Sequence, residues 1–228
     1  ALGDRLRDAR VRAVIAPMLA GEILPAVPNE DLRYVIDLGL VRLTATGGLD
    51  VANPIYREVI ARELAFAPRA SLPSLHPTWL GEGGRLDPAR LCEAFLSFWR
   101  RHGEPLMRMA PYHEGAPQLV LLAFLDRVAN GGGSVEREYA IGRGRMDVCL
   151  RYGQDRVGIE LKVWRDGRPD PLGEGLEQLE GYLAGLDGVT AGWLVIFDQR
   201  SGLPPVEQRT SAEAARTPSG REVTILRA

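Results

Sequence analysis

The sequence predicts an α/β protein made of two parts. Its second half alternates segments of helical periodicity with segments that have the period-two or continuous apolar pattern of strands. A stretch rich in proline, glycine and serine comes before that half, and helices with one short hairpin come before the stretch. We therefore expect a small domain over residues 1–66, a linker over 67–88 and a larger α/β domain over 89–228.

In the first part, the residue pattern predicts helices and a β-hairpin. Asn29 suits a helix N-cap, and Pro54 suits the first turn of a helix, where its missing N–H is not needed. Gly47 and Gly48 suit a turn between two short strands. The predicted elements are helices over residues 2–19, 29–38 and 53–64, and strands over 40–43 and 49–51.

In the larger part, helices and strands follow one another along the chain. Gly131, Gly132 and Gly133 end a helix whose apolar residues recur at helical spacing. A continuous apolar run near residue 195 is typical of a strand covered on both faces. The predicted elements are helices over residues 88–101 and 117–130, an extended segment over 134–141, strands over 146–150 and 157–163, a helix over 175–186 and a strand over 192–198.

Lys162 is the only lysine in a chain that has 28 lysines and arginines together. One lysine left by chance on an arginine-rich surface is the simplest alternative to a functional role. The neighbouring residues favour the functional role, because apolar residues occupy the odd positions from 157 to 163 and polar ones or glycine the even positions. In a strand, Glu160 and Lys162 then project from the same face.

A hairpin brings a second carboxylate toward this pair. The strand over 146–150 is joined to the strand over 157–163 by a segment whose Gly153 and Asp155 suit a turn, so Asp147 can stand beside Glu160 and Lys162. Carboxylates are hard oxygen ligands of the kind that Mg²⁺ prefers, and a lysine can position a water on the ion or help deprotonate it.

This constellation resembles the PD-(D/E)XK superfamily of restriction-endonuclease-like nucleases, with Asp147, Glu160 and Lys162 in the motif positions. Met146 stands where the motif has proline, and this proline is often absent in the superfamily. The resemblance implies a restriction-endonuclease-like core, in which helices flank a mixed central sheet, and a Mg²⁺ or Mn²⁺ ion held by Asp147 and Glu160. Because superfamily members commonly aim a glutamate from the preceding helix at the metal, Glu114 is the third candidate ligand.

Two flanking segments strengthen the resemblance. Gln178 and Tyr182 are four residues apart on the helix after the lysine strand, and they resemble an accessory Gln-x-x-x-Tyr motif of several nuclease branches, which implies that they help to position the substrate. Upstream, Arg143 and Arg145 share the face of Asp147 if the chain is extended, and they could there bind phosphates. A solvated bend, with these arginines paired to neighbouring glutamates, explains the same segment equally well.

The first part resembles a different kind of domain. Helices followed by a short hairpin resemble a winged helix. The segments 34–41 and 51–58 look like the winged-helix tail of bacterial and archaeal AAA-like ATPases, some of which carry a PD-(D/E)XK domain at the C-terminus. The resemblance implies that the chain is the C-terminal part of such a protein, with the ATPase portion as its partner. In those ATPases the winged helix more often packs on the nucleotide domain than on DNA.

Composition limits the classes of function. No apolar run reaches the roughly 18 residues of a membrane span, and no signal peptide is evident, so we expect a cytoplasmic protein without membrane contact. Cys92 and Cys149 lack disulfide or metal spacing and are expected to be buried thiols. A formal net charge of -2 means that any binding of nucleic acid is local.

These observations lead to two hypotheses. The first is a metal-dependent nuclease that hydrolyses phosphodiester bonds of nucleic acid, with DNA as the expected substrate. The second is a catalytically inactive DNA-binding or regulatory module of an AAA-like ATPase. The presence of all three motif residues favours the enzyme, because a decayed site usually loses one of them.

Overall fold

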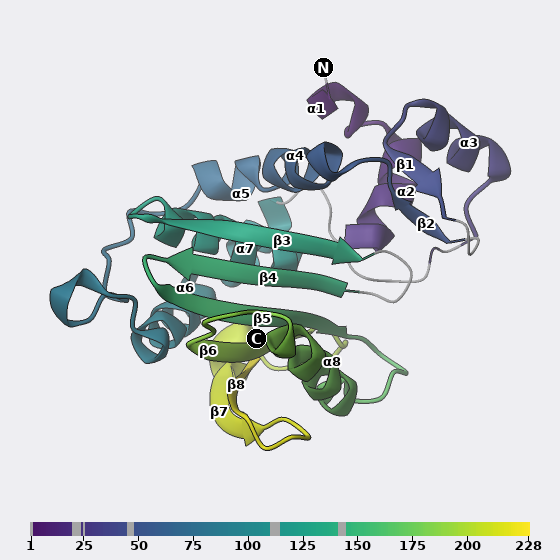
Figure 1. The fold of residues 1–228 in the computed structure, drawn as a ribbon. Coiled ribbons are helices and arrows are strands. Elements are labelled where there is room, and N and C mark those ends of the chain that lie inside the picture. The colour runs from purple at the N-terminus through teal and green to yellow at the C-terminus, as the bar shows by residue number, and fades with distance from the viewer. Residues whose placement is uncertain (1, 20–23, 25, 45–47, 110–114, 141–144) are drawn as a thin grey trace. The chain divides into compact units, whose positions relative to one another are not determined.

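The computed structural model contains two compact units. Unit 1 comprises residues 1–71, 106–123 and 139–146, and unit 2 comprises residues 72–105, 124–138 and 147–228. Figure 1 labels most of the helices and strands. The structure describes every residue except 1, 20–23, 25, 45–47, 110–114 and 141–144.

Unit 1 begins with the predicted helices and hairpin. Val41 pairs with Val51 in the antiparallel hairpin, and Val35 and Leu40 are fully buried beside it. The N-terminal elements are α1 (Leu2–Arg5), α2 (Ala9–Leu19), α3 (Asn29–Asp37), β1 (Val41–Leu43), β2 (Leu49–Val51), α4 (Pro54–Leu64) and α5 (Phe66–Ala70).

The first predicted helix is divided into α1 and α2, and Asp8 explains the division. The Asp8 carboxylate accepts a hydrogen bond from the backbone N–H of Arg10 at 2.9 Å, and the Asp8 carbonyl accepts the first bond of α2, from Arg12. An aspartate that satisfies the orphan N–H groups of a first turn starts a new helix. Hydrogen bonds from Arg10 lower the pKa of Asp8 to about 2, so this cap is ionised at neutral pH.

The chain has a mixed α/β architecture in which helices flank a six-stranded sheet, as the sequence predicts (Figure 1). The strand order is β3-β4-β5-β6-β8-β7. The remaining elements are η1 (Glu82–Gly84), α6 (Pro88–Met109), α7 (Ala116–Ala129), β3 (Gly133–Ala140), β4 (Arg145–Tyr152), β5 (Asp155–Trp164), α8 (Leu172–Ala184), β6 (Ala191–Asp198), α9 (Val206–Arg209), β7 (Ser211–Arg216) and β8 (Glu222–Arg227).

The sheet combines antiparallel and parallel pairs. Strands β4 and β5 form an antiparallel hairpin, and its two-residue turn begins at Gly153, whose φ of 58° suits glycine. Strands β5, β6 and β8 are parallel neighbours, and β7 returns antiparallel to β8 at the sheet edge. The carboxyl ends of β5, β6 and β8 therefore lie at one end of the sheet, which is where open α/β sheets commonly bind ligands.

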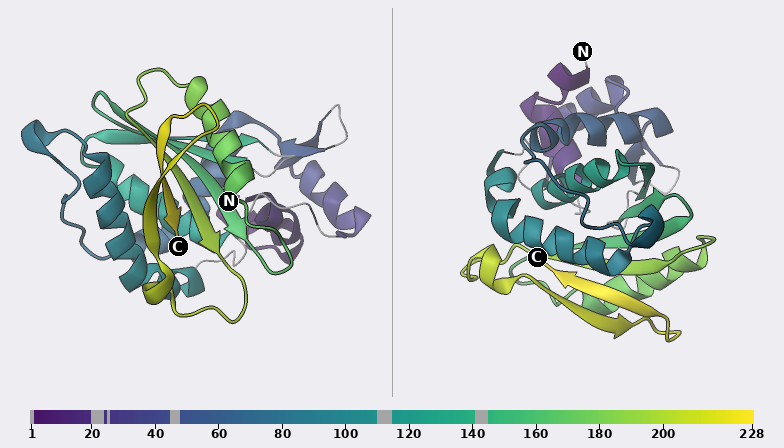
Figure 2. Two further views of the ribbon diagram at one scale, coloured as in Figure 1. Left: turned by 90° about the horizontal axis from the view of Figure 1, so that it is seen from below. Right: turned by 90° about the vertical axis from the view of Figure 1, so that its left-hand side faces the viewer.

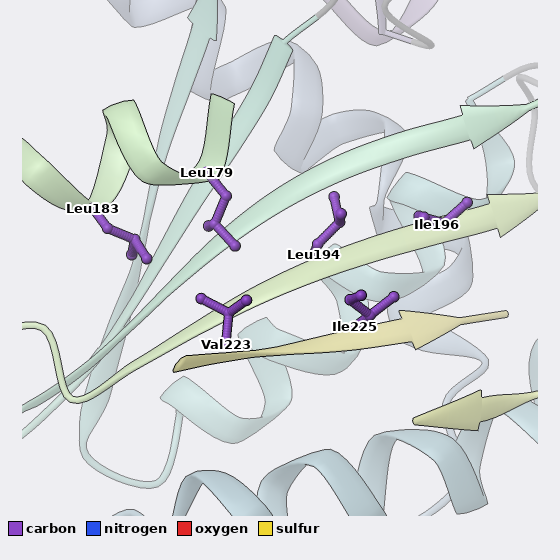
Figure 3. Packing of buried hydrophobic residues seen from close by; sticks show 6 residues of the cluster. All are labelled: Leu179, Leu183, Leu194, Ile196, Val223 and Ile225. Carbon is purple, nitrogen blue, oxygen red and sulfur yellow. The ribbon is translucent and has the colours of Figure 1, made fainter. Parts of the chain in front are cut away.

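Helix α8 covers one face of the sheet. Figure 3 shows Leu179 and Leu183 of α8 pointing toward residues of β6 and β8. Together they form one buried hydrophobic cluster: Leu179, Leu183, Leu194, Ile196, Val223 and Ile225. Because side chains alternate along a strand, Phe197 points to the opposite face. There its ring lies 5.0 Å from that of Trp99 on α6, so α6 and α8 cover opposite faces (Figure 2).

Glycines bring α8 unusually close to the sheet. A Cβ atom at Gly175 of α8 would lie 2.6 Å from Leu194, and a Cβ at Gly158 or Gly192 would lie 2.6 Å from Leu183. Real Cβ atoms do not approach other carbons so closely, so a side chain at any of the three positions would require the helix or the opposing leucine to shift. Because these three glycines have no side chain, α8 packs closely enough for its polar residues to reach the strand beneath it.

One further expectation agrees with the structure. Cys92 and Cys149 are free and buried, as predicted. Among the described residues, no helix combines the length and apolar character that crossing a lipid bilayer requires.

Candidate functional site

Strand β5 places Glu160 and Lys162 on the sheet face that α8 covers. Val157, Ile159 and Leu161 of the same strand are buried on the other face. Glu160 is fully buried, and the Lys162 side chain is only 8% exposed. The Lys162 Nζ atom lies 3.4 Å from Glu160 Oε1.

Helix α8 brings two polar side chains to the same ammonium group. Lys162 Nζ donates a hydrogen bond to Gln178 Oε1 and lies 3.4 Å from Glu174 Oε1. The Gln178 Nε2 group donates to Glu174 Oε1 at 2.7 Å. Glu174 and Gln178 are one helical turn apart, so they project from the same face of α8. The lysine ammonium is thus held by two carboxylates and one amide oxygen.

The electrostatics of this group are uneven. Glu160 is completely shielded from solvent, whereas the Glu174 side chain is 63% exposed. The Glu160 to Lys162 pair is therefore a buried ion pair, and removing one partner of such a pair costs about 3–5 kcal/mol. The Glu174 contact is screened by water and contributes at most about 1 kcal/mol. The ammonium therefore lies between a buried carboxylate on β5 and an exposed carboxylate and an amide on α8.

Asp147 lies on β4, the strand that pairs antiparallel with β5. The described pairs of this hairpin begin with Val148 opposite Ile159. The side chain of Asp147 lies outside the described residues.

The other predicted residues are distributed as follows. Tyr182 follows Gln178 by one helical turn. A Cβ at Gly158 would lie 3.4 Å from the Tyr182 ring, so the ring lies over the part of β5 that comes before Glu160 and Lys162. Arg145 is the first residue of β4, and its side chain is outside the described residues. Glu114 and Arg143 are outside the described residues altogether.

Oxygen donors near Lys162 are the candidate ligands of a divalent ion. Within the described part of the chain, no three histidine, cysteine, aspartate or glutamate side chains are arranged to hold a metal ion; the Asp147 side chain and Glu114 lie outside that part. The described donors near Lys162 are the carboxylates of Glu160 and Glu174 and the amide oxygen of Gln178. Hard oxygen donors of this kind suit Mg²⁺ or Mn²⁺ and do not suit soft metals.

Glu174 is the site residue that sequence reasoning missed. It precedes Gln178 by four residues, so the helical spacing that linked Gln178 to Tyr182 also extends backward to Glu174. That spacing was the available signal. An exposed glutamate in the first turn of a helix is otherwise ordinary, because it interacts favourably with the helix dipole.

Beyond Lys162, the ends of the parallel strands carry paired charges. The Arg200 guanidinium lies 3.4 Å from the centre of the Trp164 ring, and Arg200 Nη2 lies 2.7 Å from Asp198 Oδ2. Partial burial acts to raise the pKa of Asp198, but hydrogen bonds from Arg200 outweigh it and lower the pKa. Arg227 similarly pairs with Asp170 at 2.9 Å. Each of these arginines has an acidic partner, so this region adds little net positive charge.

No protein-family model matches this chain, and no curated protein matches it in sequence. The functional conclusion therefore depends on the residues and their geometry.

Proposed function

We propose that this chain is a metal-dependent nuclease that hydrolyses phosphodiester bonds, with DNA as the expected substrate. The observation that supports this most is the position of its single lysine. Lys162 is nearly buried beside the fully buried Glu160, and Gln178 from α8 converges on the same ammonium.

A purely structural role explains this arrangement poorly. Desolvating a carboxylate and an ammonium costs several kcal/mol for each ion, and well-packed apolar residues in their place are often as stable or more stable. On the sheet face that carries the pair, the neighbouring β6 residues Leu194 and Ile196 are apolar and fully buried, so this face accepts such residues. A buried ion pair on a face that also accepts apolar packing favours a chemical role for the pair.

In the proposed mechanism, the residues have distinct tasks. Glu160, Asp147 and Glu114 would hold Mg²⁺ or Mn²⁺, which supplies a Lewis acid for the scissile phosphate and an acidified water when bound. The Lys162 ammonium donates a hydrogen bond to the attacking water or to the phosphate oxygen on which charge develops. Gln178 and Tyr182 position the nucleic-acid strand, and Arg143 and Arg145 bind its phosphates.

We also propose a finer assignment of the fold. The order α7, β3, β4, β5, α8, β6 is the element order of a restriction-endonuclease-like core. The order of α2, α3, the β1–β2 hairpin and α4 suits a winged helix. With the resemblance of these segments to AAA-like ATPases, this supports a cytoplasmic protein whose longer chain includes an ATPase portion.

A cleavage assay tests the proposed function. The chain is incubated with linear, circular and single-stranded DNA in Mg²⁺, Mn²⁺ or EDTA, beside a Lys162→Ala variant whose folding is checked by its thermal unfolding midpoint. We expect cleavage that requires the metal and is lost in the variant. The comparison of linear with circular DNA separates cutting at ends from internal cutting.

The same assay separates the alternative function. If the chain binds DNA but cleaves none of the substrates in either metal, the site does not act as a nuclease on its own and the regulatory-module hypothesis replaces the proposal. If the Lys162→Ala protein cleaves as fast as the wild type, the role proposed for the lysine is wrong.

A further inference from the structure

We propose that Glu174 is a positioning residue that orients the Lys162 ammonium by fixing the side-chain amide of Gln178. Nothing in the PD-(D/E)XK motif requires a carboxylate at this position. The catalytic importance of this orientation rests on the proposed nuclease function. The orientation itself rests on three contacts, among Lys162, Gln178 and Glu174.

The argument begins with the two ends of the Gln178 amide. One end is an acceptor and the other is a donor, so a rotation of 180° exchanges them. Only one orientation presents Oε1 to the ammonium, and the other would direct an N–H group toward a positive charge. Lys162 donates to Gln178 Oε1, and Gln178 Nε2 donates to Glu174 Oε1 at 2.7 Å.

Glu174 makes the amide orientation that presents Gln178 Oε1 to Lys162 favourable at both ends of the amide. Its carboxylate only accepts hydrogen bonds when ionised, so it selects the amide end that carries N–H groups. The same Oε1 atom lies 3.4 Å from Lys162 Nζ, so the three side chains form a closed triangle of contacts. Without this carboxylate, water can satisfy the amide in either orientation, and the ammonium loses a fixed acceptor.

The exposure of Glu174 makes the proposal testable without damage to the fold. Its side chain is 63% exposed, whereas Glu160 is fully buried, so replacing Glu174 leaves the buried pair in place. Glu177 offers a matched control, because it is an exposed glutamate on the same helix. Glu177→Ala makes the same change in charge and size one residue before Gln178, about 100° around the helix from it.

The single lysine provides the measurement. Acylation by an amine-selective reagent, followed by peptide mapping, reports Lys162 separately from the N-terminal amine. We expect Glu174→Ala to label about twofold to fivefold faster than the wild type, the range given by a solvent-screened contact between charged groups. Glu174→Gln keeps an acceptor for the amide and should fall between the two, while Glu177→Ala should match the wild type.

A spectroscopic readout accompanies the labelling. The ¹³Cε resonance of Lys162, which is the only lysine signal, should shift in Glu174→Ala and keep its wild-type position in Glu177→Ala. Thermal midpoints measured on the same proteins show whether faster labelling comes from general loosening of the fold. A drop in the midpoint that accounts for the whole increase would overturn the proposal.

The outcomes separate this proposal from the proposed function. If Lys162 reactivity and its resonance are unchanged in Glu174→Ala, the positioning role is wrong whether or not the protein cleaves DNA. An equal change in Glu177→Ala would also refute it, because the effect would then be one of helix charge. If the lysine responds as expected while the wild type cleaves nothing, the positioning role stands and the nuclease function fails.

Discussion

The close approach of α8 to the sheet can be tested by Gly175→Ala. A Cβ at this position would lie 2.6 Å from Leu194 Cδ1 and 2.9 Å from Leu194 Cδ2. Leu194 is fully buried in the cluster beneath α8 (Figure 3), so its side chain cannot turn away without displacing its neighbours. The substitution therefore forces either the helix or the cluster to move.

Two effects of opposite sign determine how much Gly175→Ala changes the free energy of unfolding. Overpacking a well-packed core costs about 1–3 kcal/mol, whereas exchanging a helical glycine for alanine gains about 1 kcal/mol. We expect the packing cost to exceed the gain, because a separation of 2.6 Å is about 1 Å shorter than an optimal carbon contact. The net result should be a loss of about 1 kcal/mol in the free energy of unfolding.

Gly181→Ala is the control on the same helix. A Cβ at Gly181 would meet no atom within 4 Å, so this variant should gain about 0.5–1 kcal/mol from helix propensity alone. Urea denaturation of both variants and the wild type gives the two differences directly. If Gly175→Ala proves as stable as Gly181→Ala, the close packing of α8 on β6 is refuted, and with it our account of how Glu174 and Gln178 reach Lys162.

Two further predictions concern titratable groups. Burial raises the pKa of Cys92 to about 11 and also raises the pKa of Cys149, so both thiols should resist Ellman's reagent at pH 8 until denaturant is added; two rapidly reacting thiols in the native protein would contradict this. In the folded protein the pKa of Asp198 is lower than its usual 3.8. The ionised carboxylate therefore stabilises the folded state above pH 3.8, and this contribution is lost as the pH falls through the pKa of the folded state. Between pH 6 and 2, the unfolding midpoint of the wild type should therefore fall more steeply than that of Asp198→Asn, and parallel profiles would show that the Arg200 pair contributes nothing.

The sequence predicted the elements that carry strong local patterns. The alternation from Val157 to Val163 became β5, and the continuous apolar run near Val195 became β6. The predicted hairpin between β4 and β5 is also present, and the two-residue turn at Gly153 sets its register from Val148 and Ile159 onward.

Elements without such patterns were not predicted. Strand β7 has exposed or half-exposed side chains throughout and lies at the sheet edge. A strand in that position needs no apolar face, so no alternation marks it in the sequence. Its partner β8 departs from strict alternation, because Ile225 and Leu226 are both buried, and it follows the turn at Gly220.

Spacing from Gln178 places Glu174 on the same helix face, but the contact of Glu174 with Lys162 could not be predicted from local sequence. Its contact with Lys162 joins a helix to a strand twelve residues earlier, and the contact depends on how closely the helix lies on the sheet. That distance is set by Gly158, Gly175 and Gly192, which read in sequence only as residues that weaken a helix or strand. Their role becomes visible only when the opposing side chains, Leu183 and Leu194, are in place.

The most direct test of the proposed function is the rate at which Lys162→Arg cleaves DNA in Mg²⁺. This variant keeps the positive charge beside Glu160 but replaces a compact ammonium by a planar guanidinium, which differs in size, hydration and proton affinity. We expect the initial rate to fall by about 10²-fold or more while the thermal midpoint stays close to that of the wild type. A rate within a few-fold of the wild type would show that any cation at this position suffices, and would contradict the role assigned here to the only lysine of the chain.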